Sequence, residues 1–264
     1  MGLLLNDVIL LMKVRQCCSK DINIFTLGPP TSHVLNEDLK FLTRPEILEK
    51  LGISLNLIDK YYLKKLNKQP DKKKTTFNFF TKLIKIRNYF SIDIDKKSKP
   101  TYCIDITKKI SKNLINKADL IYDTGSLSYT GSHYNALNFL NKLLKKRGII
   151  LHQSTNNGSP VTGYCQINRS YFDFYYKEYE KILICYGFCD NFLNYFRTNK
   201  KSSRIIHIDS DPKLVELMNK KNYLYYAVRK VKKNISKNKR FYFYSDNKIF
   251  RKYFRNLLFI SKFN

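Results

Sequence analysis

Acidic and small residues recur where the predicted strands end, and these residues are the best candidates for a binding site. Gly28 directly follows the apolar run 23–27. Asp93 and Asp105 each lie near the end of a run rich in β-branched and aromatic residues, and Asp123 closes another. Parallel strands end at one edge of a sheet, where open α/β folds bind ligands. A carboxylate at that edge can accept hydrogen bonds from two adjacent ribose hydroxyls, so the pattern favours a nucleotide site.

Each of these residues also has a plainer interpretation. Asp is a common turn residue at strand ends, and one glycine can simply allow a tight turn. Gly28 has no companions that would complete a G-x-G-x-x-G fingerprint, which argues against a nicotinamide-dependent dehydrogenase. The nucleotide interpretation therefore depends on the joint placement of the acids.

The segment 118–153 predicts the element that positions part of this edge. An apolar run at 120–122 is stopped by an Asp-Thr-Gly triplet, and a helical pattern follows over 133–146. Gly148 is expected to end the helix before the second apolar run, 149–151. Two short strands around a helix of this length predict a βαβ unit with a right-handed crossover.

The loop between the first strand of this unit and its helix would face the ligand. Asp123, Gly125 and Ser126 are therefore predicted at the binding edge. The strands expected along the whole chain are 23–27, 89–94, 101–106, 120–122, 149–151, 182–186 and 204–208.

The remaining segments suggest one α/β domain with elaborations. We expect an amphipathic docking helix at 1–20, a domain over 21–210 with a helical insertion at about 36–86, and a basic, aromatic extension over 211–264 packed on it. A helix capped by Ser170 carries aromatic residues around most of its circumference. We interpret these aromatic residues as buried packing rather than a platform for stacking bases.

The net charge of +28 over 264 residues has two explanations. A field of this size would attract nucleic acid, anionic lipid or an acidic substrate. The abundance of Lys, Asn, Ile, Tyr and Phe is also what an AT-rich coding sequence would produce. The basic, aromatic extension also has two interpretations. It could bind a nucleic-acid strand, or it could form an antiparallel edge hairpin with solvated lysines.

The cysteines show no paired C-x-x-C spacing, and no histidine accompanies Cys185 and Cys189 at the spacing of a zinc site. We therefore predict reduced thiols in a cytoplasmic protein and no metal site. The apolar N-terminal run is interrupted by Asn6, Asp7 and Lys13, which argues against a signal peptide or a membrane-spanning helix.

The stretch 118–179 resembles the second half of small class I S-adenosylmethionine-dependent methyltransferase-like proteins. The resemblance starts with a strand that ends in D-x-G-[ST]-L, which is followed by a helix, a Leu-Leu-Lys turn with glycine, and a strand. A block of the form Gly-aromatic-x-Gln with later aromatic residues comes next. Including the upstream strands, the resemblance spans about 20–190. The block consists of Gly163, Tyr164, Gln166, Tyr171, Phe172, Phe174 and Tyr175.

This resemblance implies a Rossmann-like, seven-stranded, mostly parallel sheet with helices on both faces, the class I methyltransferase architecture. It also implies S-adenosylmethionine as the cofactor. Gly28 would lie near its methionine end, Asp93 would face the ribose, and Asp105 would lie on the adenine side. The segment from Asp123 through Gly125 to Ser126 would form the rim between cofactor and acceptor.

The chain departs from the family pattern on the acceptor side. Ser128 and Tyr129 stand where the group usually has Glu-His, and Val161 and Thr162 stand where it has Asp-His before the glycine.

Methyl transfer requires binding, alignment and, for a hydroxyl or amine acceptor, removal of a proton. His152, at the tip of the strand after the crossover, is the first candidate for the base, ahead of His133. A hydrogen-bonding structural role is the alternative for His152. Tyr129 and Tyr164 are candidates for shaping the acceptor pocket.

The leading hypothesis is therefore an S-adenosylmethionine-dependent methyltransferase that acts on a small molecule or a glycan. One alternative is an RNA-directed methyltransferase, which the net charge of +28 motivates. The other alternative is a non-catalytic binding protein that keeps the fold.

Overall fold

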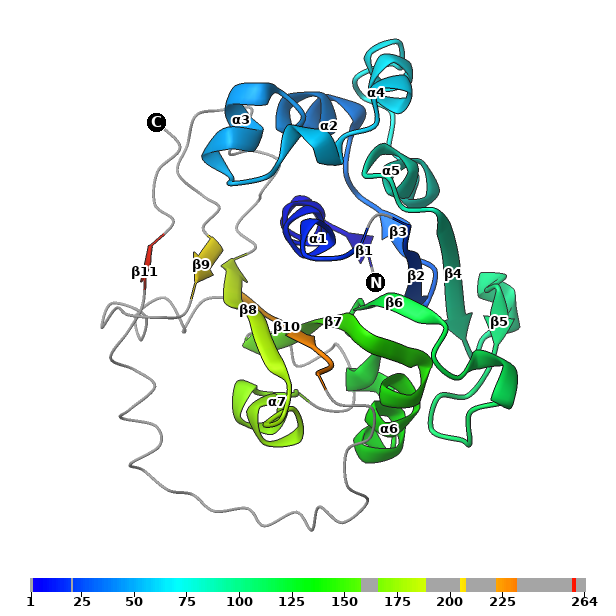
Figure 1. The fold of residues 1–264 in the computed structure, drawn as a ribbon. Coiled ribbons are helices and arrows are strands. Elements are labelled where there is room, and N and C mark those ends of the chain that lie inside the picture. The colour runs from blue at the N-terminus through cyan, green and yellow to red at the C-terminus, as the bar shows by residue number, and fades with distance from the viewer. Residues whose placement is uncertain are drawn as a thin grey trace.

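A nine-stranded sheet runs through the protein in the order β11-β9-β8-β10-β7-β6-β2-β4-β5 (Figure 1). The computed structural model describes residues 2–19, 21–157, 166–188, 205–207, 222–231 and 258–259. The strands are β2 (Asn23–Leu27), β4 (Asn88–Asp93), β5 (Tyr102–Cys103), β6 (Ala118–Asp123), β7 (Leu144–Asn157), β8 (Glu180–Phe188), β9 (Ile205–His207), β10 (Asn222–Arg229) and β11 (Leu258–Phe259).

Seven of these strands have the class I methyltransferase order. Strand β2 is parallel to β4 and β6, β4 is parallel to β5, and β6 is parallel to β7. Strand β10 is antiparallel to both β7 and β8. Numbered along the chain without β9 and β11, the strands follow the order 3-2-1-4-5-7-6. The fold class expected from the sequence is confirmed, and β9 and β11 extend the sheet beyond β8.

The central strands are buried on both faces because core side chains cover each side. Leu120, Ile121 and Tyr122 of β6 are fully buried. Successive residues point to opposite faces. Leu120 and Tyr122 therefore belong to one apolar cluster, while Ile121 belongs to the other. Such continuous apolar runs are typical of parallel strands covered on both sides.

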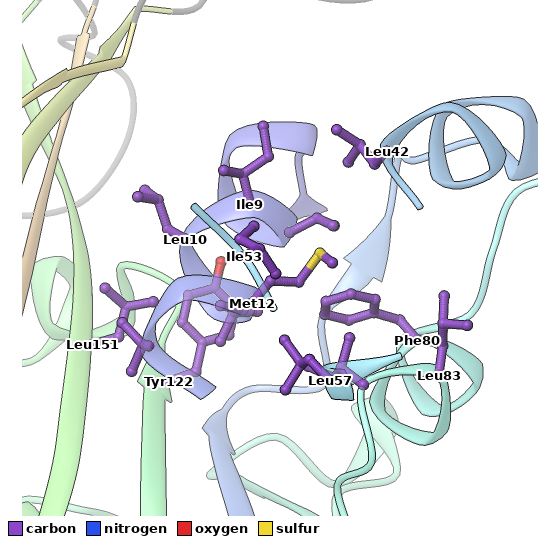
Figure 2. Close-up of a cluster of buried hydrophobic side chains, with 14 of the residues drawn as sticks. Ile9, Leu10, Met12, Leu42, Ile53, Leu57, Phe80, Leu83, Tyr122 and Leu151 are labelled. Atoms are coloured by element: carbon purple, nitrogen blue, oxygen red, sulfur yellow. The ribbon is translucent and has the colours of Figure 1, made fainter. Parts of the chain in front are cut away.

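The N-terminal helix α1 (Leu5–Gln16) is buried on all sides, so the expectation of an amphipathic helix is wrong. The helix lies between the sheet and the helices that follow β2 (Figure 1). Figure 2 shows Ile9, Leu10 and Met12 of α1 among side chains from both of these layers. Tyr122 of the sheet and Phe80 of the helical segment belong to the same cluster. A helix covered on both sides needs apolar residues around its whole circumference.

The segment between β2 and β4 is helical, as predicted, but no helix starts directly after β2. Instead, Thr31–Ser32 forms β3, which pairs in parallel with β1 (Gly2–Leu3). The N-terminal end of the chain therefore lies beside the segment that follows the tip of β2. The helices of this segment are α2 (Asn36–Leu42), α3 (Pro45–Lys50), α4 (Lys60–Asn67) and α5 (Phe77–Leu83).

The predicted βαβ unit is present, with different boundaries. Helix α6 (His133–Leu143) ends before Gly148, and Leu144 already belongs to β7. The pairing of β7 with β6 shifts register near Gly148, where Arg147 has a φ of 64°. Gly148 therefore lies within an irregular start of β7 and does not end the helix.

Three further elements differ from the sequence prediction. Strand β5 has only two residues, so Asp105 lies beyond its end. Helix α7 (Arg169–Tyr175) is capped by Asn168, whose side chain accepts from Tyr171 N, and not by Ser170. Strand β10 was expected to be part of a C-terminal extension, yet it is an inner strand of the sheet.

Several predicted features lie outside the described residues, including Val161, Thr162, Gly163 and Tyr164 of the acceptor side. Among the described residues, no helix is long and apolar enough to cross a membrane. This part of the chain also holds no group of three His, Cys, Asp or Glu side chains that could bind a metal ion. The cysteines described are free thiols, namely Cys17, Cys18, Cys103 and Cys185.

Candidate functional site

The tips of β2, β4 and β6 meet at Gly28. A Cβ atom on Gly28 would lie 3.6 Å from Asp93 Oδ2 and 3.8 Å from Ser126 Oγ. Gly28 has a φ of +74°, in the left-handed region that favours glycine. Strands β2 and β6 are neighbours in the sheet although β4 and β5 separate them in the chain, which makes this edge the topological switch point. The sequence prediction that Gly28, Asp93 and Ser126 lie together is thus met by the geometry.

Asp93 presents a partly exposed carboxylate at this edge. Its Oδ1 accepts a hydrogen bond from Asp95 N at 3.0 Å, and its Oδ2 accepts one from Ser98 Oγ at 3.0 Å. A carboxylate offers about four acceptor positions, so positions remain for a vicinal diol. The next residue, Ile94, is 67% exposed and adds an apolar surface beside the carboxylate. Ile94 is not among the site residues predicted from the sequence, although its position directly after Asp93 is a signal for it.

The carboxylate of Asp123 is buried and is used within the protein. Its Oδ1 accepts from Gly125 N at 3.0 Å and from Ser126 N at 2.8 Å. Gly125 has a φ of 91°, so the turn requires a residue that tolerates the left-handed region. Asp123 therefore shapes the turn at the rim, while Gly125 and Ser126 form the part of the turn nearest the edge.

The same turn is tied to β2 by two hydroxyl groups. Thr124 Oγ1 and Ser126 Oγ each donate to Leu27 O at 2.9 Å. Leu27 is the residue before Gly28, so these bonds fix the distance between the two parts of the candidate site.

Asp105 lies in a turn of its own, two residues beyond β5. Its Oδ1 accepts from Thr107 Oγ1 at 2.7 Å and from Thr107 N at 2.8 Å. These two hydrogen bonds lower the pKa of the Asp105 carboxyl. The side chain is partly exposed.

His152 is fully buried, and both of its ring nitrogens have partners. Nδ1 lies 2.9 Å from Asp123 Oδ2, and Nε2 lies 2.8 Å from the Tyr176 hydroxyl. The ring stacks on Phe172 with centroids 4.6 Å apart. Neither ring nitrogen is available to take a proton from a methyl acceptor, which favours the structural alternative over the role of general base.

Two other candidates for the acceptor side lie nearer the surface. Tyr129 ends the short turn of helix Ser126–Tyr129 and is 45% exposed, beside the rim formed by Gly125 and Ser126. His133 begins α6, and its ring lies 6.0 Å from that of Tyr171.

The structure also contains a buried acid that is not among the site residues predicted from the sequence. Asp7 of α1 is fully buried, and burial raises the pKa of its carboxyl to about 7. The hydrogen bond that Leu4 N donates to Asp7 Oδ2, at 2.5 Å, partly opposes this rise, and so do the nearby hydroxyls of Tyr225 and Tyr122. An acid inside an otherwise apolar run was the available signal, because a charged residue is rarely fully buried without a partner.

No protein-family model matches the chain, and no curated protein matches it. Among solved structures, the MccD protein is similar over 84% of this chain and 96% of its own, at 10% identity with a TM-score of 0.41. TehB from Haemophilus influenzae is similar over 85% of this chain and 62% of its own, at 12% identity with a TM-score of 0.45.

A third similar structure is the Burkholderia thailandensis 1,6-didemethyltoxoflavin-N1-methyltransferase with bound 1,6-didemethyltoxoflavin and S-adenosylhomocysteine. The likeness covers 86% of this chain and 78% of that one, at 9% identity with a TM-score of 0.40. These likenesses are too distant to assign residues. The fold is therefore identified from the structure itself: the strand order and the converging strand tips are those of the class I methyltransferase architecture.

Proposed function

We propose that this chain is an S-adenosylmethionine-dependent methyltransferase that binds its cofactor across the tips of β2, β4 and β6. The observation that carries the proposal is the meeting of Gly28, Asp93 and Ser126 at the topological switch point. The switch point of an open α/β sheet is where nucleotide-like ligands bind. When bound, the cofactor supplies an activated methyl group on a sulfonium.

The proposed roles follow from exposure and hydrogen-bonding capacity. Asp93 accepts hydrogen bonds from the ribose hydroxyls, and Ile94 packs against the adenine. Gly28 lets the backbone approach the methionine end of the cofactor. Asp105 lies toward the adenine side, and the turn of Gly125 and Ser126 closes the rim.

We assign Tyr129 to the acceptor side of the site. The acceptor is a small molecule or a glycan, and the exposed ring of Tyr129 helps to orient it. Because the methyl group is already activated, the protein accelerates the displacement by positioning the acceptor, and positioning can supply about 7–11 kcal/mol. His152 takes no part as a base in this proposal, because both its ring nitrogens are engaged.

Isothermal calorimetry with S-adenosylhomocysteine tests cofactor binding directly. Replacing Asp93 by Ala removes acceptors for the ribose and should weaken binding about 10- to 100-fold, which corresponds to about 1.5–3 kcal/mol for hydrogen bonds to a charged group. Asp119→Ala is the matched control, because Asp119 lies at the opposite end of β6 and pairs with Lys145. The proposal would be refuted if no heat of binding were seen at near-millimolar ligand, or if the two variants lost the same amount of affinity.

An RNA acceptor is the second candidate, and the net charge of +28 is the observation that favours it. Lysine and arginine contacts to phosphates give affinities that fall steeply with salt. Binding of a fluorescent single-stranded RNA should therefore be strong at low salt and lost at moderate salt. Absence of RNA binding at low salt would remove this candidate.

A further inference from the structure

A continuous chain of hydrogen bonds joins the end of α7 to the turn at the cofactor edge. The Tyr176 hydroxyl lies 2.8 Å from His152 Nε2, and His152 Nδ1 lies 2.9 Å from Asp123 Oδ2. The other oxygen of Asp123 holds the amides of Gly125 and Ser126. The chain thus crosses from α7 through β7 and β6 to the rim of the site.

The direction of these hydrogen bonds follows from the chemistry of Asp123 and Tyr176. A carboxylate oxygen only accepts, so His152 carries its proton on Nδ1 and donates it to Asp123 Oδ2. His152 Nε2 then accepts from the Tyr176 hydroxyl, which keeps its proton because burial raises its pKa well above the usual value. Every polar atom of the imidazole ring is satisfied, and the parallel ring of Phe172 holds its plane.

The network acts on the candidate site through Asp123. A carboxylate that can rotate would hold the two amides loosely, whereas the bond from His152 Nδ1 fixes its second oxygen. These groups are buried, so their mutual attraction is stronger than it would be in water. The turn they hold is also bonded to the carbonyl before Gly28. The position of this turn therefore sets the distance between Gly28 and the rim formed by Gly125 and Ser126.

We propose that His152 and Tyr176 are positioning residues that set the orientation of the Asp123 carboxylate and, through it, the turn of Gly125 and Ser126. Cofactor affinity then depends on the placement of α7. The effect on affinity rests on the proposed function, whereas the effect on the turn can be measured without any ligand.

The test uses the full chain and compares Tyr176→Phe with Tyr175→Phe. Both variants remove one buried hydroxyl from neighbouring residues, but the Tyr175 hydroxyl bonds Asn138 of α6 and stands outside the network. Amide resonances of Gly125 and Ser126, and the ¹⁵N shifts of the His152 ring, are recorded by NMR on ligand-free protein. Tyr176→Phe should move these signals, and Tyr175→Phe should leave them in place.

Calorimetry with S-adenosylhomocysteine supplies the second readout. Tyr176→Phe should weaken binding about three- to tenfold, the range expected from the loss of one hydrogen bond, and Tyr175→Phe should not. If the wild type binds and the two variants give the same NMR and binding results, the positioning role is refuted. If the wild type does not bind but only Tyr176→Phe moves the signals, the proposed function fails while the positioning role stands.

Substitutions at His152 give an independent comparison. His152→Asn keeps a donor directed toward Asp123, whereas His152→Ala does not. The Asn variant should disturb the amides of Gly125 and Ser126 less than the Ala variant. Equal disturbance would show that His152 only fills space, and would overturn the proposal.

Discussion

Two buried groups with similar chemistry lie on opposite faces of the central sheet, and they differ in how well their polar atoms are satisfied. On one face, Asp123 has three hydrogen-bond partners. On the face covered by α1, Asp7 lies near the hydroxyls of Tyr122 and Tyr225. Among the described residues, Asp7 Oδ1 and the Tyr225 hydroxyl have no hydrogen-bond partner.

The difference separates two uses of a buried carboxyl group. A satisfied carboxylate fixes the geometry of its surroundings, as Asp123 does for the turn beside Gly28. A poorly satisfied carboxyl instead stays protonated over a wider pH range, because ionisation in an apolar setting is costly. We expect mutations on the first face to change the site, and mutations on the α1 face to change the dependence of stability on pH.

The largest effect is expected for Asp123→Ala. The change leaves His152 Nδ1 and two backbone amides without their buried acceptor. Leaving buried polar groups unpaired should cost about 3–5 kcal/mol of the free energy of unfolding, measured by urea denaturation. Asp119→Ala, at the partly exposed end of the same strand, should cost far less, and a similar loss in both variants would contradict the comparison.

The next effect is the pH dependence caused by Asp7. The carboxyl has a pKa of about 7 in the folded state and about 4 when unfolded, so the folded state binds more protons between these values. The free energy of unfolding should therefore fall as the pH rises from about 4 to about 7, by on the order of 4 kcal/mol from this group, and level off above.

Asp7→Asn removes the titration and keeps the shape of the side chain. Its free energy of unfolding, measured by urea denaturation across this pH range, should lack that decline. The stability of the variant relative to the wild type should therefore increase as the pH rises. Parallel pH profiles for the two proteins would show that Asp7 does not hold its proton in the folded state.

A smaller effect is expected for Gly28→Ala. The φ of +74° is unfavourable for a residue with a Cβ atom by about 1–2 kcal/mol, although the nearest side-chain atoms are at ordinary contact distances. The variant should lose that much stability in thermal unfolding and bind S-adenosylhomocysteine more weakly. Unchanged stability together with unchanged binding would mean that the loop adapts and that Gly28 is a plain turn residue.

The smallest effects come from a matched pair of tyrosines, one on each face. Tyr176→Phe removes a hydroxyl that is hydrogen-bonded to His152 and should cost about 1 kcal/mol. Tyr225→Phe removes a hydroxyl without a partner and should be neutral or slightly stabilising. Denaturation at pH 6, where Asp7 keeps its proton in the folded state, measures both. Equal destabilisation of the two variants would contradict the proposed difference between the two faces of the sheet.

The elements that were predictable from sequence are those whose signals are local. Strand β2 agrees with the expected run 23–27, and β6 with helix α6 matches the predicted start of a βαβ unit. Strand β10 was not predicted because both of its partners, β7 and β8, are distant in the chain. The amphipathic expectation for α1 failed because the helices that cover its outer side belong to a later segment.

Within the site, sequence could place residues at strand tips but could not show what occupies their hydrogen-bonding atoms. The joint position of Gly28 and Asp93 followed from the rule that parallel strands end together. The role of His152 did not follow, because Asp123 and Tyr176 lie 29 and 24 residues away in the chain. Only the folded structure shows that both nitrogens are taken.

The inner position of β10 has a consequence for synthesis on the ribosome. Strands β7 and β8 have no partner on their facing sides until residues 222–229 have emerged and inserted between them. Until then, the nascent chain carries two open strand edges with unpaired N–H and C=O groups, which favours association between chains. Closing the sheet is therefore a late, long-range step, and a chain that ends before Asn222 should aggregate instead of forming a smaller stable domain.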